Sequence, residues 1–134
     1  MNARITIKST SDGEVVSQAK AVGEMEISPS FAIVRYDEVT PGMENTVTEL
    51  TIEADKVVLR RTGQYESEMV FVPNLTSNFT LRTPFGKIPL SVYSETVSGK
   101  IGQRGVSLNL EYVITTGGVS TRQTLNLYSL SKEI

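Results

Sequence analysis

Apolar and polar residues alternate with a period of two along most of the chain, most clearly between Gly105 and Thr115. There one parity is apolar, at Val106, Leu108, Leu110, Tyr112 and Ile114, and the other is mostly polar. A period of two places every second side chain on the same face of a β-strand. Thr116-Gly117-Gly118 follows, and glycine tolerates the positive φ of tight turns. The pattern therefore predicts a hairpin whose second strand spans Val119–Ser129.

The same alternation predicts eight further strands, separated by segments rich in proline, glycine, aspartate and asparagine that suit turns. No long segment shows the i, i+3, i+4, i+7 spacing of an amphipathic helix. We therefore predict an all-β fold, a single antiparallel β-barrel of about 8–10 strands with little helix. It is expected to form one domain over residues 1–134. The eight strands are expected at Arg4–Ser9, Glu14–Ile27, Ser30–Glu38, Thr46–Ala54, Lys56–Arg61, Glu66–Val72, Asn78–Thr83 and Lys87–Val97.

Charge and composition exclude several kinds of partner. The chain carries 13 basic and 15 acidic side chains, for a net charge of −2, and so lacks the clustered basic face that nucleic-acid binding usually needs. It has no apolar stretch of membrane-spanning length and no apolar signal-peptide segment near Met1. It contains no cysteine, which is compatible with a reducing compartment. We expect a cytoplasmic protein that binds neither nucleic acid nor membranes.

The chain also contains no histidine. Ser-His-Asp and Cys-His catalysis are therefore impossible, as is a zinc site with histidine or thiolate ligands. Acidic pairs have the spacing of neighbours on a solvated strand face; they are Glu24/Glu26, Glu49/Glu53 and Glu66/Glu68. We predict no catalytic residues, no metal site and no cofactor.

The predicted strand Glu14–Ile27 has small residues at the odd positions in its middle, including Ala19, Ala21 and Gly23. If this face points inward, the strand fills little of the barrel centre, and a barrel of about eight strands can hold one small ligand. Small residues also let a strand coil sharply or approach another backbone closely. Both interpretations stay open, and Ala19, Ala21 and Gly23 are candidate ligand-binding residues under the first.

Three polar residues continue strand faces that begin apolar. Tyr36 and Glu38 continue one such face, and Arg61 continues another. We hypothesise that the phenol, the carboxylate and the guanidinium meet at one end of the barrel and orient a polar group of a ligand there. A structural ion pair, or exposure at the strand ends, is the alternative. Unfolding of Arg61→Ala and Glu38→Gln distinguishes these, because changes below about 0.5 kcal/mol would mean that both groups are solvated.

Three short motifs occur in a fixed order along the chain: Tyr36-Asp37-Glu38, Arg61-Thr62-Gly63 and Thr83-Pro84-Phe85-Gly86. With them, the chain resembles the YwiB-like family, small bacterial proteins catalogued as a domain of unknown function with a calycin-type, lipocalin-like β-barrel. The resemblance implies a closed barrel and a bacterial, cytoplasmic origin, and it implies no activity. Calycin barrels elsewhere often hold apolar small molecules, which is an analogy at the level of the fold.

Three classes of function stay open, and we favour the first. It is a non-catalytic binding module that holds a small, mostly apolar ligand inside the barrel. The second is a structural or interaction protein that acts through its outer surface or a strand edge, with a homodimer as one form. In Phe31–Val34 and Lys56–Leu59, apolar residues stand at both odd and even positions, so both faces of these strands would be apolar. An apolar outer face favours this second class. The third is an enzyme whose carboxylates converge on the cavity.

Overall fold

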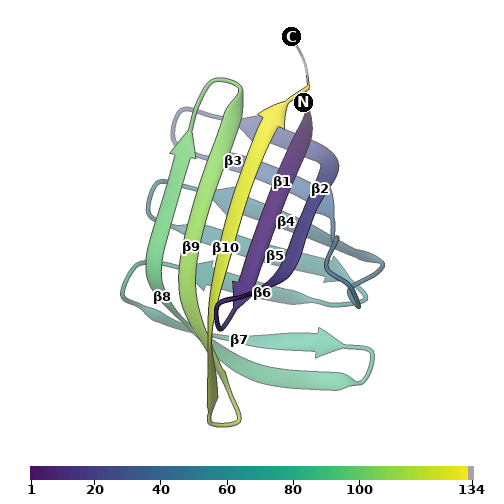
Figure 1. Cartoon of the computed structure of the whole chain (residues 1–134), viewed down its shortest axis with the longest axis vertical. Coiled ribbons are helices and arrows are strands. Elements are labelled where there is room, and N and C mark those ends of the chain that lie inside the picture. The colour runs from purple at the N-terminus through teal and green to yellow at the C-terminus, as the bar shows by residue number, and fades with distance from the viewer. Residues whose placement is uncertain (133–134) are drawn as a thin grey trace.

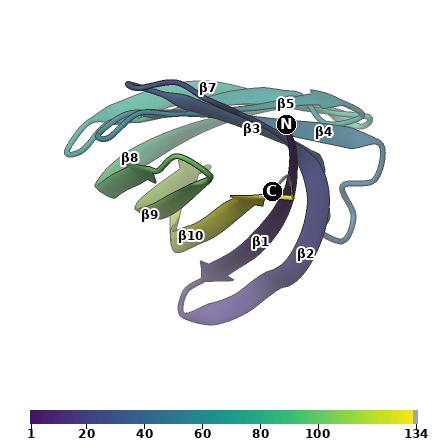
Figure 2. The ribbon, with the colours of Figure 1, turned by 90° about the horizontal axis from the view of Figure 1, so that it is seen from above.

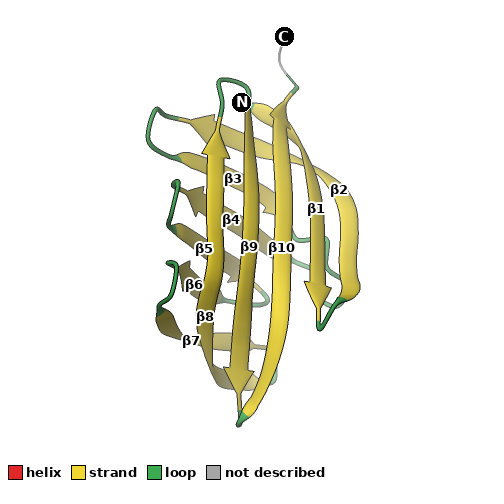
Figure 3. Cartoon of the chain, turned by 60° about the vertical axis from the view of Figure 1, so that its left-hand side comes forward, coloured by secondary structure: helices red, strands yellow, loops and turns green. Residues whose placement is uncertain are grey.

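The computed structural model describes residues 1–132, and all ten predicted strands are present in it. All strand pairs are antiparallel, and the described part of the chain contains no helix (Figure 3), so it contains none that could cross a membrane. The predicted all-β fold is confirmed. Of the predicted domain, 1–134, the last two positions lie outside the described residues. The strands are β1 (Asn2–Ser11), β2 (Glu14–Ile27), β3 (Ala32–Asp37), β4 (Thr46–Ile52), β5 (Val57–Gly63), β6 (Ser67–Phe71), β7 (Thr76–Thr83), β8 (Gly86–Ile101), β9 (Gly105–Thr116) and β10 (Val119–Ser131).

The strands form one continuous sheet in the order β6-β5-β4-β3-β2-β1-β10-β9-β8-β7. In Figure 1, β1, β9 and β10 run along the long axis of the molecule, and β3 to β6 cross behind them. Seen from above, the sheet curls so that these two layers face each other (Figure 2). The strands at the two ends of the sheet, β6 and β7, contact each other. The barrel is therefore nearly closed.

The apolar side chains, which occupy alternate positions of each strand, point into the barrel. In β1, for example, Ala3, Ile5 and Ile7 are buried while the residues between them are exposed. Phe71 on β6 is fully buried, and its ring meets that of Tyr112 on β9 edge to face, with the centroids 5.0 Å apart. Residues from opposite layers thus share one core, and removing this apolar surface from water drives the closure.

The long strand β2 changes its partner along its length and so joins the two layers. It pairs with β1 as far as Glu24 and with β3 from Glu24 onward. Gly23 lies at this corner, where a Cβ atom would be only 2.1 Å from the backbone oxygen of Arg35. Glycine therefore permits an approach of two backbones that no other residue allows.

The barrel closes through one isolated bridge next to β6 and β7. Glu66 and Arg82 exchange two backbone hydrogen bonds, of 3.0 and 2.8 Å. Within residues 1–132, no further ladder pairing joins β6 to β7. The N–H groups of Glu68 and Thr80 point the same way as those of the bridge, because direction alternates along a strand. They face the seam between β6 and β7, across which the ladder does not continue.

We expect the backbone amides of Glu68 and Thr80 to exchange with deuterium at least about a hundredfold faster than that of Met69, after correction for intrinsic rates. Met69 differs because its N–H points away from the seam, toward its partner Leu59 on β5. Hydrogen exchange followed by NMR measures this. Equal protection of the three amides would mean that β6 and β7 are paired in solution.

Candidate functional site

A cavity of about 320 Å³ lies inside the barrel. Tyr36, Glu38 and Arg61 all line it, so the structure brings together the three polar residues that strand parity predicted to meet. Val16 also lines the cavity and is 52% exposed, which places it at the rim. Most of the remaining wall is apolar and includes Leu59, Met69, Phe79, Leu81, Leu90 and Leu125.

Strand register gathers the polar groups into one row across four strands. Tyr36 on β3 lies opposite Thr48 on β4, Thr48 lies opposite Arg61 on β5, and Arg61 lies opposite Ser67 on β6. Residues that face each other in this way have Cβ atoms about 4.5–5.5 Å apart. Glu38, two residues beyond Tyr36, bonds to members of this row. The row forms the polar end of the cavity.

Glu38 is held by three neighbouring side chains. Its carboxylate is almost fully buried, with 3% of the side chain exposed. The Thr40 hydroxyl donates to Oε1 at 2.7 Å, and the Thr48 hydroxyl donates to Oε2. Arg61 Nε donates to Oε2 at 3.5 Å. Both carboxylate oxygens therefore have protein donors.

The protonation of Glu38 reflects two opposing effects. Burial by itself raises the pKa of a carboxyl group, because it disfavours the charged form. Here the charge of Arg61 and the hydrogen bonds from Thr48 and Thr40 outweigh burial, and the pKa of Glu38 falls below its usual value. Glu38 is therefore a carboxylate at neutral pH, and with Arg61 it makes a pair of zero net charge.

Two buried tyrosines, Tyr36 and Tyr112, add phenol groups to the cavity wall. Their side chains are 4% and 6% exposed, respectively. Burial raises the pKa of both hydroxyls, and the charge of Glu38 raises that of Tyr36 further. Neither hydroxyl bonds to another side chain or backbone group within the described chain, and both oxygens keep some accessible surface. They stay protonated and are available to a ligand.

The other three sequence candidates lie elsewhere on the inner side of β2. Ala19, Ala21 and Gly23 are half-buried, and they are not among the residues that line the cavity. At Gly23 the small side chain makes room for the backbone of Arg35. This position thus follows the alternative interpretation, in which small residues permit close approach.

Sequence reasoning missed several residues of the site. Thr40 and Thr48 bond to Glu38, while Ser67 and Tyr112 line the cavity. One signal was available for Tyr112, because it carries a polar group on an otherwise apolar strand face. The signal for Thr48 was weaker, because Thr46 shares its face with it beside Leu50 and Ile52. No comparable signal marks Thr40, which follows the end of β3.

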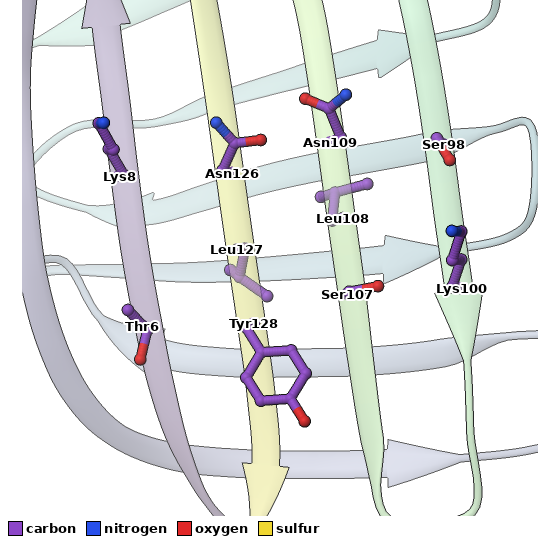
Figure 4. Close-up of a pocket in the computed structure, with 10 residues that line it drawn as sticks. All are labelled: Thr6, Lys8, Ser98, Lys100, Ser107, Leu108, Asn109, Asn126, Leu127 and Tyr128. Atoms are coloured by element: carbon purple, nitrogen blue, oxygen red, sulfur yellow. The ribbon is translucent and has the colours of Figure 1, made fainter.

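A second hollow lies on the outer surface, across β1, β10, β9 and β8 (Figure 4). Its volume is about 430 Å³, larger than that of the interior cavity. Lys8 and Lys100 flank it, and Asn109, Asn126 and the half-exposed Tyr128 lie between them. None of its polar side chains is buried. The interior cavity has the more specific chemistry, since Glu38 at its polar end is almost fully buried and is bonded to Thr48 and Arg61.

This nearly closed antiparallel barrel of ten strands, with a partly polar cavity inside, fits a calycin-like fold. The chain belongs to the family described as "Domain of unknown function (DUF1934)", whose model matches residues 3–127. The fold is similar to that in the crystal structure of ywiB protein from Bacillus subtilis, with a TM-score of 0.84 and 14% sequence identity over 97% of this chain and 91% of that chain. No curated protein matches the chain. The predicted resemblance is confirmed, and it assigns no activity.

Proposed function

We propose that this protein is a non-catalytic binding module that holds a small, mostly apolar ligand inside the barrel. The observation that carries the proposal is a cavity that combines an apolar wall with a few fixed, buried polar groups. Its volume of about 320 Å³ is in the range of small-molecule sites, which are mostly apolar with few polar groups. The rim at Val16 would give a ligand its entry.

Titration with short-chain fatty acids, isoprenoids and their neutral analogues tests this proposal. We expect binding to raise the melting temperature, because a ligand that binds only the folded state stabilises it. In NMR spectra, the resonances of Phe79, Leu81 and Leu125 should shift. A complete panel that produces neither effect would remove the proposal.

Replacing Leu90 by tryptophan should weaken ligand binding by at least about tenfold, because the larger side chain fills space in the cavity. Leu90 is half-buried and lines the cavity from β8. Calorimetric titration measures the effect. Tyr128→Trp is the matched control, since Tyr128 is 49% exposed on the outer surface. If Leu90→Trp folds and binds like the wild type, the ligand does not occupy the interior.

The second candidate function is that of an interaction protein whose outer surface forms a homodimer contact. Val22, Tyr128 and Leu130 favour it, since they are 66%, 49% and 43% exposed on the outside of β2 and β10, the two strands that flank β1. Large exposed apolar patches often mark interaction sites. Light scattering decides between monomer and dimer, and a strict monomer at high concentration would remove the homodimer.

We also propose a cytoplasmic location. The absence of cysteine supports it, because disulfides are typical of oxidising compartments. Cell fractionation tests it, and recovery of the protein from the culture medium would contradict it.

A further inference from the structure

The polar end of the cavity has more donors than the protein itself uses. Glu38 is the only carboxylate that lines the cavity within the described chain, and it already accepts from Thr40, Thr48 and Arg61 Nε. The two Nη groups of Arg61 have no hydrogen-bond acceptor among residues 1–132. Because a guanidinium carries five N–H donors in a fixed fork, most of its capacity is unused.

The phenols add to this surplus. Tyr36 and Tyr112 are both buried, line the same cavity, and interact electrostatically with Arg61. Their hydroxyls are protonated donors without a protein acceptor in the described structure. Their side chains are largely buried, but the two hydroxyl oxygens stay accessible from the cavity, where a donor can bind an acceptor. A ligand would therefore be favoured at this end if it supplied an acceptor.

The charge of the site limits what that acceptor can be. Arg61 and Glu38 neutralise each other, so the polar end has donors but no net positive charge. A ligand carboxylate would bring a second negative charge close to Glu38, and an unbalanced charge in a buried site is costly. An uncharged carbonyl can accept from Arg61 and the tyrosines without this cost.

We propose that the cavity selects an uncharged amphiphile whose head group is a hydrogen-bond acceptor, such as a ketone or an ester. The carbonyl accepts from the free Nη groups of Arg61 and from a tyrosine hydroxyl. The apolar chain lies along Phe79, Leu81 and Leu90. This inference rests on the proposed function and adds the chemical class of the ligand.

The test compares 2-decanone with decanoate at neutral pH, on the wild type and on Glu38→Gln. Any apolar cavity favours the ketone to some degree, so the decisive quantity is the ratio of the two dissociation constants. In the wild type we expect the ketone to bind at least about tenfold more tightly. Glu38→Gln leaves Arg61 uncompensated, and we expect it to move the ratio toward decanoate by at least about tenfold, since a nearby opposite charge favours the ionised form.

The outcomes separate this inference from the proposed function. If neither probe binds and the wider panel of ligands fails as well, the proposed function fails; if neither probe binds but another apolar ligand does, only the ligand class is wrong. If decanoate binds the wild type more tightly, or if Glu38→Gln folds and leaves the ratio within about twofold, the ligand class is wrong while interior binding stands. If Glu38→Gln does not fold, NMR of the wild type decides: 2-decanone should shift the Arg61 Nε–H resonance, and an unmoved resonance overturns the inference.

Discussion

Gly23→Ala is expected to destabilise the protein by about 3 kcal/mol or more, because the new methyl group would overlap the backbone of β3. Overpacking typically costs about 1–3 kcal/mol and occasionally more. The added Cβ would lie 2.1 Å from the backbone oxygen of Arg35 and 2.9 Å from Ile5 Cδ1. A side chain such as that of Ile5 can rotate away, but the backbone oxygen of a paired strand cannot. The barrel corner would have to open.

Urea denaturation measures this loss as a lower transition midpoint. Gly102→Ala is the matched control, because its Cβ would have only Gly105 O nearby, at 3.4 Å. That distance is an ordinary van der Waals contact, so the control should change stability by less than about 0.5 kcal/mol. A Gly23→Ala variant as stable as the control would show that β2 and β3 do not approach so closely at this corner.

The strands could be predicted from the sequence because each has one buried face. A shift of the strand register by one residue would move all of its apolar side chains into water. Segments such as Gly105–Thr116 therefore show a clear alternation of apolar and polar residues. Strand ends were predicted less well. β8, expected over Lys87–Val97, spans Gly86–Ile101, because its pairing with β9 continues beyond the alternating stretch.

The site could be predicted in part, because the odd or even position of a residue in its strand determines whether its side chain points inward. This rule placed Tyr36, Glu38 and Arg61 on inner faces, and all three line the cavity. Parity does not give the register between strands, and register is what puts Thr48 between Tyr36 and Arg61. Nor does a small residue reveal what occupies the space beside it, which at Gly23 is backbone.

Glu38→Gln is expected to lower the free energy of unfolding by about 2–3 kcal/mol at pH 7. Removing one partner of a buried ion pair costs about 3–5 kcal/mol. The lower figure applies to Glu38 because 21% of the Arg61 side chain is exposed, against 3% for Glu38. Glu68→Gln is the control: its pair with Arg60 is exposed on both sides, and such pairs contribute about 0–1 kcal/mol.

The effect of Glu38→Gln should also depend on pH, with a sign fixed by the lowered pKa of Glu38. Below the ordinary glutamate pKa of about 4.3, the unfolded chain takes up a proton that the folded chain still excludes, so acid favours unfolding. The stability that Glu38 contributes is therefore complete above this value and is lost as the pH falls through the lower pKa of the folded state. The difference in the free energy of unfolding between wild type and Glu38→Gln should be largest near pH 7 and should become smaller in acid. Glu68→Gln should show no comparable difference from wild type. A difference below about 0.5 kcal/mol at pH 7, or one that stays constant into acid, would mean that Glu38 is solvated and that the polar end of the cavity is not built around its charge.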